Sequence, residues 1–215
     1  MNYKLLIFDL DGTILNTLED LCNSTNYALE AHNFPTRTIE EVRKFVGNGI
    51  KKLIERAVPS GTSSEAIEQV LDTFKKHYAL HCADKTSPYD GIMELLTALR
   101  AQGFLTAVVS NKADFAVQSL CNDYFPGMFD FVVGEREGIR RKPYPDSVEE
   151  VLTKLQVKKE QAVYIGDSEV DIQTAKNAGM LSIAVSWGFR EEALLREQGA
   201  ENIVNKPSEI LNFIG

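Results

Sequence analysis

The chain has 215 residues, of which 44% are hydrophobic and 25% charged, as is ordinary for a globular protein with a sizeable core. Its net charge of −8 argues against nucleic acid as a partner, because a phosphate backbone requires a basic face. Cys22, Cys82 and Cys121 are odd in number and widely spaced, so we interpret them as reduced thiols. Neither a signal peptide nor an apolar run of the ~20 residues that span a membrane is apparent, and we expect a cytoplasmic protein without a membrane partner.

The first predicted element is a short apolar strand over residues 5–8, and it is followed at once by two aspartates. Asp9 and Asp11 are one residue apart, and Gly12 ends the strand. Side chains of an extended segment alternate, so both carboxylates are expected to point the same way. Such close like charges are costly unless a cation, a proton or a reaction uses them. The alternative is an ordinary solvated acidic turn.

The next part of the chain has only helical patterns, up to about residue 82. Capping boxes at 38–41 and 62–65 are expected to begin its second and fourth helices. The apolar positions of the four stretches fall within 18–32, 39–45, 50–57 and 67–78. An all-helical block after a single strand indicates an insertion. We therefore expect a helical domain over 16–83 inside a core domain formed by 1–15 and 84–215.

From Ser87 onward, strands alternate with helices of about ten residues. Strands are expected at 104–109, 129–133, 162–165, 181–185 and 202–204. Helices are expected at 91–102, at 113–122, at 146–156 after an Asp146–Glu149 capping box, and before Gly179. This alternation predicts the α/β class, with a doubly wound parallel sheet of the Rossmann-like kind.

Polar side chains follow the strands of this sheet at four points. They are Asp9 with Asp11, Ser110 with Asn111, Lys142, and Asp167 with Asp171. Each group alone has an ordinary explanation as a helix cap, a turn or a solvated basic residue. Because the carboxyl ends of parallel strands share one edge of the sheet, the four groups are expected to converge in space.

These residues carry a clear family resemblance. The segments Asp9–Thr13, Ser110–Lys112, Lys142–Pro143 and Gly166–Asp171 resemble, in order, the motifs of the haloacid dehalogenase superfamily. The similarity covers essentially the whole chain and is to the phosphatase branch, in which a helical cap domain follows the first motif. Two weaker similarities, at 45–49 and 187–188, are to the phosphoglycolate phosphatase group.

The resemblance implies roles for the residues that match the motifs. Asp9 would be the nucleophile that forms an aspartyl phosphate, and Asp11 the general acid/base. Asp9, Asp167 and the backbone carbonyl of Asp11 would bind Mg²⁺, which prefers oxygen ligands. Asp171 would orient water ligands or Lys142.

Further residues are expected to bind the phosphoryl group or the rest of the substrate. Lys142 would offset negative charge, and Ser110 with the backbone N–H of Asn111 would bind phosphoryl oxygens. The two-glycine loop that contains Gly47 and Asn48 is a candidate substrate contact, since its backbone N–H groups can approach an anion.

The sequence thus predicts a Mg²⁺-dependent phosphatase for a small phosphorylated metabolite, acting as a monomer or a homodimer. Phosphoglycolate is the leading substrate by resemblance alone. The alternatives on the same scaffold are a phosphomutase like β-phosphoglucomutase and an inorganic pyrophosphatase. A receiver-type signalling domain also has an acidic cluster with a lysine, but it lacks the long helical insertion.

Overall fold

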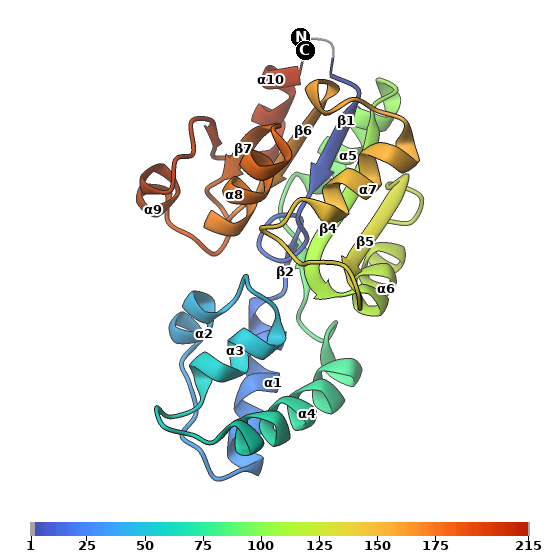
Figure 1. Ribbon diagram of the computed structural model, residues 1–215. Coiled ribbons are helices and arrows are strands. Elements are labelled where there is room, and N and C mark those ends of the chain that lie inside the picture. The colour runs from blue at the N-terminus through green and yellow to red at the C-terminus, as the bar shows by residue number, and fades with distance from the viewer. Residues whose placement is uncertain (1–2, 215) are drawn as a thin grey trace. The chain divides into compact units, whose positions relative to one another are not determined.

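The structure is a computed structural model that describes residues 3–214 (Figure 1). The chain divides into two compact units, one of Met1–Leu15 with Pro88–Gly215 and the other of Asn16–Ser87. The second crossing between the units therefore lies at Ser87, whereas we expected it at residue 83. At the crossings, the short strands β2 (Leu15–Asn16) and β3 (Ser87–Pro88) pair with each other.

The larger unit is built on a six-stranded parallel sheet. Its strands are β1 (Leu5–Phe8), β4 (Leu105–Ala113), β5 (Phe131–Glu135), β6 (Ala162–Gly166), β7 (Leu181–Val185) and β8 (Ile203–Val204). They are ordered β5-β4-β1-β6-β7-β8, so the first strand lies in the middle with β4 on one side and β6 on the other. The predicted doubly wound α/β fold is confirmed.

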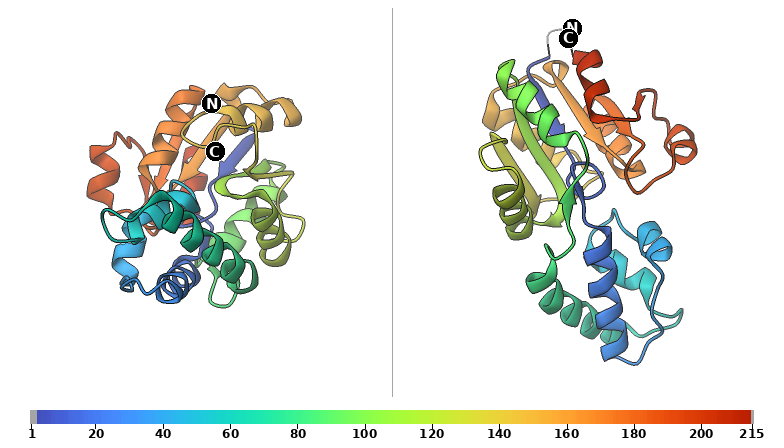
Figure 2. Two further views of the ribbon diagram at one scale, coloured as in Figure 1. Left: turned by 60° about the horizontal axis from the view of Figure 1, so that its bottom comes forward. Right: turned by 180° about the vertical axis from the view of Figure 1, so that it is seen from behind.

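Helices cover both faces of this sheet (Figure 2). They are α5 (Ile92–Ala101), α6 (Asp114–Tyr124), α7 (Asp146–Leu155), α8 (Glu169–Ala178), α9 (Glu192–Glu197) and α10 (Leu211–Ile214). Leu5 and Ile7 pack in the cluster that includes residues of α7 and α8, whereas Leu6 and Phe8 pack with α5 and α6. A strand buried on both faces needs the continuous apolar run from which β1 was predicted. Packing on both faces holds the end of β1 in place.

Three local expectations for the elements are wrong. Strand β4 does not stop before Ser110 but continues to Ala113, with a register shift against β5 after Val109. Helix α7 lacks the expected capping box, because the carboxylate of Asp146 pairs with the guanidinium of Arg140 at 2.8 Å.

The third concerns the start of the fourth helix. Its N-cap is Ser63, whose hydroxyl accepts from the N–H of Ala66 at 3.2 Å. The hydroxyl of Thr62, which we expected to cap the helix, instead donates to the carbonyl of Pro59 at 2.7 Å.

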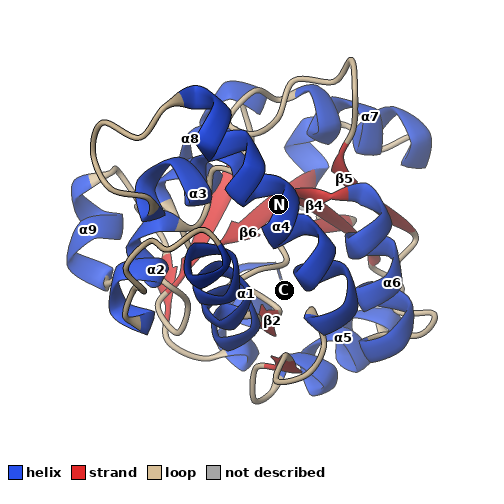
Figure 3. Cartoon of the chain, turned by 90° about the horizontal axis from the view of Figure 1, so that it is seen from below, coloured by secondary structure: helices blue, strands red, loops and turns tan. Residues whose placement is uncertain are grey.

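The smaller unit consists of four helices, labelled α1 to α4 in Figure 3. They are α1 (Leu18–Ala31), α2 (Ile39–Phe45), α3 (Ile50–Ala57) and α4 (Ser64–His81). The Thr38–Glu41 capping box is present at the start of α2 as predicted. Among the described residues, no helix has both the length and the apolar character needed to cross a bilayer.

A buried carboxylate on α1 fixes the last segment of the helical unit. Asp20 is 2% exposed and accepts from the backbone N–H groups of Lys85 and Thr86 at 2.8–3.0 Å. It also accepts from the Thr86 hydroxyl at 2.8 Å. The Asp20 carboxylate therefore ties the segment after α4 to α1.

We expect Asp20→Ala to lower the free energy of unfolding by about 1–3 kcal/mol, because it leaves buried backbone donors without a partner. Glu19→Ala is the matched control, since Glu19 is an exposed carboxylate on the same helix turn. Chemical denaturation of both variants measures the difference. Equal stability of the two would show that the Asp20 contacts contribute nothing.

Candidate active site

The carboxyl ends of the three central strands supply most of the predicted site. Asp9 directly follows β1, Ser110 and Asn111 lie in β4, and Asp167 directly follows β6. Because β1 pairs with both β4 and β6 in parallel, these positions share one edge of the sheet. The geometry of the site therefore follows from strand order.

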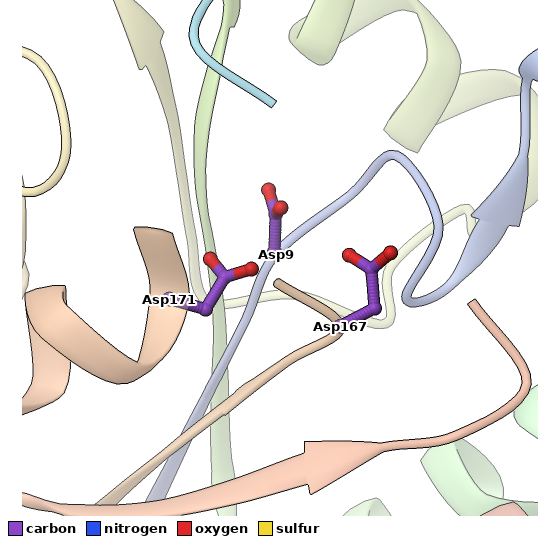
Figure 4. Close-up of side chains that lie close together, drawn as sticks. All are labelled: Asp9, Asp167 and Asp171. Atoms are coloured by element: carbon purple, nitrogen blue, oxygen red, sulfur yellow. The ribbon is translucent and has the colours of Figure 1, made fainter. Parts of the chain in front are cut away.

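Three buried carboxylates form a cluster at this edge. Asp9, Asp167 and Asp171 each offer an oxygen atom, and these atoms all lie within 4.8 Å of one another. Figure 4 shows the three side chains gathered at the ends of β1 and β6 and on the first turn of α8. Burial raises the pKa of Asp9 to about 7, and the charge of Asp171 adds to the shift while Lys142 opposes it. Burial and the charges of Asp171 and Asp9 likewise raise the pKa of Asp167.

One buried lysine compensates part of this negative charge. The ammonium of Lys142 lies 2.9 Å from Asp9 and 2.8 Å from Asp171. Burial disfavours the charged lysine, but Asp171 and Asp9 outweigh it and hold the pKa of Lys142 well above its ordinary value. The ammonium therefore stays charged beside the two carboxylates at neutral pH.

The side chain of Asn111 holds the backbone of Lys142 in place. The Lys142 N–H donates to Oδ1 of Asn111 at 2.9 Å, and Nδ2 of Asn111 donates to the Lys142 carbonyl at 3.1 Å. Asn111 thus joins the end of β4 to the segment before α7. The sequence suggested only that its backbone N–H binds a phosphoryl oxygen.

Asp167 lies in a tight cradle formed by two glycines. A Cβ atom added to Gly12, whose φ is +84°, would lie 2.3 Å from Oδ2 of Asp167. A Cβ atom at Gly188 would lie 2.3 Å from the Asp167 Cβ. The N–H of Phe189 donates to Oδ2 of Asp167 at 2.7 Å. We did not expect Phe189 at the site, although the neighbouring residues 187–188 had been noted for their similarity to phosphatases.

Asp11 lies beside the cluster rather than in it. Its carboxylate pairs with the ammonium of Lys112, which lies 3.0 Å from Oδ1 and 3.2 Å from Oδ2. We had predicted no role for Lys112, and the only signal was its place in the Ser110–Lys112 segment that resembles a family motif. Ser110 is buried, and its hydroxyl accepts from the N–H of Lys112 at 3.3 Å.

Gly47 and Asn48 belong to the helical unit, on the segment between α2 and α3. The guanidinium of Arg56 donates to Oδ1 of Asn48 at 2.8 Å and to the carbonyl of Phe45 at 2.7 Å. These two contacts hold the ends of the loop.

The acidic cluster fits a hard divalent cation. The ammonium of Lys142 pairs with two of its three carboxylates, Asp9 and Asp171, so ionising all three leaves an excess of negative charge in a buried place. A cation held by carboxylate oxygens removes that excess, and Mg²⁺ prefers such ligands. Burial, followed by the charges of neighbouring carboxylates, raises the pKa values of Asp9 and Asp167, and a bound cation would favour their ionised forms.

Comparisons with known proteins agree with this arrangement. The family model of the haloacid dehalogenase-like hydrolases matches residues 6–185. A phosphoglycolate phosphatase of Aquifex aeolicus is 29% identical over 212 residues, covering 98% of this chain and 96% of its own. An N-acetylmuramic acid 6-phosphate phosphatase of Pseudomonas aeruginosa is 30% identical over 216 residues, covering 100% and 96%. The crystal structure of a proposed phosphoglycolate phosphatase from Lactobacillus delbrueckii subsp. bulgaricus has a TM-score of 0.95 at 41% identity, covering 100% and 99%.

The chain belongs to the haloacid dehalogenase-like hydrolase family. Within the family it is similar to the phosphoglycolate phosphatases, and the expected enzyme class, a phosphoric monoester hydrolase, is confirmed.

We expect Mg²⁺ to stabilise the protein against heat more at about pH 8 than at about pH 5. The folded chain binds protons at Asp9 and Asp167 more tightly than the unfolded chain does, because their pKa values are raised. Without a cation, the contribution of Asp9 to stability therefore falls as the pH rises from the ordinary carboxyl value towards about 7. A bound cation reverses this loss, since it requires the ionised carboxylates.

Thermal unfolding in EDTA and in MgCl₂ at the two pH values measures the effect. At a free concentration of about 100 times Kd, the ion should contribute about 2.7 kcal/mol. Asp167→Asn should reduce the Mg²⁺-dependent rise in Tm. A rise that is the same at both pH values and in this variant would place the ion elsewhere.

Proposed function

We propose that the chain is a Mg²⁺-dependent phosphatase that hydrolyses a small phosphorylated metabolite through a phosphorylated Asp9. The observation that carries the proposal is the pairing of the Asp9 carboxylate with Lys142 inside the buried acidic cluster. A carboxylate that attacks a phosphate dianion meets strong repulsion, and the site must offset it with positive charge. Lys142 supplies one such charge, and the cluster fits a cation that supplies more.

The proposed reaction has two steps. A carboxylate oxygen of Asp9 attacks phosphorus in line, the bond from phosphorus to the ester oxygen breaks, and Asp11 donates its proton to that oxygen. Asp11 then takes a proton from a water molecule that attacks the phosphorus of the aspartyl phosphate. The bond from phosphorus to Asp9 breaks, which releases inorganic phosphate and restores both carboxyl groups to their starting forms.

The remaining residues would bind and orient the reactants. Mg²⁺, held by Asp9, Asp167 and the backbone carbonyl of Asp11, would neutralise charge on the transferred phosphoryl group. Asp171 would keep Lys142 directed at Asp9, which the 2.8 Å contact between Lys142 and Asp171 supports. Ser110 and the N–H of Asn111 would bind phosphoryl oxygens.

We propose that the helical unit, Asn16–Ser87, acts as a cap whose loop with Gly47 and Asn48 contacts the leaving group. Phosphoglycolate is the leading substrate, on the similarity to phosphoglycolate phosphatases. The phosphatase for N-acetylmuramic acid 6-phosphate has a comparable identity, so both esters belong in a substrate panel. The proposed setting is the cytoplasm, with a monomer or homodimer acting on soluble metabolites.

A phosphate-release screen with Mg²⁺ over a metabolite panel tests the substrate, with kcat/KM measured for each hit. Release from phosphoglycolate with the highest kcat/KM supports the leading candidate. Isomerised sugar phosphate without released phosphate identifies a phosphomutase instead. Pyrophosphate as the best substrate identifies a pyrophosphatase.

Asp9→Asn should lower the hydrolysis of p-nitrophenyl phosphate by about 10³-fold or more, because an amide cannot replace the carboxylate nucleophile. The fold should persist, as judged by a cooperative thermal transition. Asp123→Asn, which alters an exposed aspartate of the same unit, is the matched control and should keep full activity. Turnover by Asp9→Asn at the control's rate would refute Asp9 as the nucleophile.

Asp11→Asn should affect alkyl phosphates far more than p-nitrophenyl phosphate. An alkoxide needs a proton to leave and general acid catalysis contributes about 10²–10⁴-fold, whereas nitrophenolate leaves without help. The quantity to compare is kcat/KM, since it reports the steps up to formation of the phosphorylated enzyme. Equal losses with the two esters would count against an acid role for Asp11.

A further inference from the structure

The larger unit contains a second buried lysine that the proposed reaction does not use. The side chain of Lys112 is 3% exposed, and its ammonium contacts both carboxylate oxygens of Asp11, at 3.0 and 3.2 Å. A buried ammonium is costly unless it is paired, and an exposed ion pair of this kind would contribute little. The fold nevertheless places the buried ammonium of Lys112 against the carboxylate of Asp11.

The two aspartates of the first motif have separate lysines. Lys142, from the segment before α7, pairs with Asp9, whereas Lys112, from β4, pairs with Asp11. Both lysines are nearly completely buried. The carboxylates of Asp9 and Asp11 repel each other, and this repulsion contributes to the raised pKa of Asp9, after burial and the charge of Asp171. Two ammonium groups on different elements hold the two carboxylates in separate places.

The backbone that carries Lys112 is closely packed. A Cβ atom added to Gly134 of β5 would lie 2.5 Å from the carbonyl oxygen of Lys112. The N–H of Gly134 donates to the carboxylate of Asp114 at 2.7 Å, and the N–H of Lys112 donates to Ser110 at 3.3 Å. The lysine therefore extends from a well-anchored strand end, as a group that orients another side chain must.

We propose that Lys112 is a positioning residue that holds the carboxyl group of Asp11 where it meets the leaving oxygen. The inference rests on the proposed function and deepens it. A carboxyl group without this partner can turn about its side-chain bonds, and a displacement of about 1 Å at a reacting group can cost about 10²-fold in rate. Lys112 thus acts on proton transfer through Asp11, whereas Lys142 acts on the attack by Asp9.

The experiment compares an alkyl phosphate with p-nitrophenyl phosphate in a double-mutant cycle. The variants are Lys112→Met, Asp11→Asn and the double variant, with the exposed Lys154→Met as matched control. Lys112→Met should lower kcat/KM about 10- to 100-fold for the alkyl ester and change it little for p-nitrophenyl phosphate. In the Asp11→Asn background, the same substitution should cause no further loss for either ester.

Two results overturn the proposal. Equal losses with both esters would mean that Lys112 acts on the phosphoryl group or on the fold. Losses that multiply in the double variant would mean that Lys112 acts independently of Asp11. A purely structural role would lower Tm and both rates together, and would not distinguish the leaving groups.

Lys112→Arg provides a second, charge-preserving variant. It should keep more activity on the alkyl ester than Lys112→Gln does, while the two should be similar on p-nitrophenyl phosphate. If Lys112→Met does not fold, this pair decides: an equal effect on both esters contradicts the proposal. Asp9→Asn, assayed beside these variants, distinguishes a failure of the proposed function from a failure of the positioning role of Lys112. Activity that survives in Asp9→Asn refutes the proposed function, whereas an inactive Asp9→Asn with no leaving-group effect at Lys112 refutes the positioning role alone.

Discussion

The repulsion among buried carboxylates at one edge of the sheet is the constraint on which the rest of the site depends. Asp9, Asp167 and Asp171 have oxygen atoms within 4.8 Å of one another and are almost completely buried. Such a group is stable only with compensating positive charge or with bound protons. Lys142 supplies one positive charge, and burial together with the neighbouring carboxylates still raises the pKa values of Asp9 and Asp167. The same deficit of positive charge that costs stability makes this edge suitable for a cation.

The fold bears this cost by fixing the carboxylates from several directions. Strand β1 lies between β4 and β6, and both of its faces pack on helices. Gly12 and Gly188 allow the backbone to close on Asp167, where any side chain would collide. Asn111 ties Lys142 to β4 through two hydrogen bonds. Charges held this firmly cannot relax apart, which is the preorganisation that phosphoryl transfer requires.

Much of this arrangement could be predicted because it depends on local patterns. The bounds of β1 and β7 agree with the expected strands at both ends, since short apolar runs between turn residues have few alternatives. The parallel sheet followed from alternating strands and helices, and the meeting of Asp9 with Lys142 followed from that sheet. The extension of β4 to Ala113 was not predictable, because it depends on pairing with the neighbouring strand β5. The cap at Ser63 was not predictable either, because Thr62 and Ser63 are both suitable N-cap residues and only the folded geometry decides which hydroxyl accepts the hydrogen bond.

The sequence by itself determined the class of fold and the residue types of the site, because hydrophobic periodicity and strand-end motifs are local properties of the chain. Only the tertiary structure decided that Asp11 has a lysine partner of its own. Lys112 lies in the Ser110–Lys112 segment that resembles a family motif, but nothing in the sequence assigns it to Asp11. That assignment depends on strand order and on side-chain burial, which arise only when distant segments pack together.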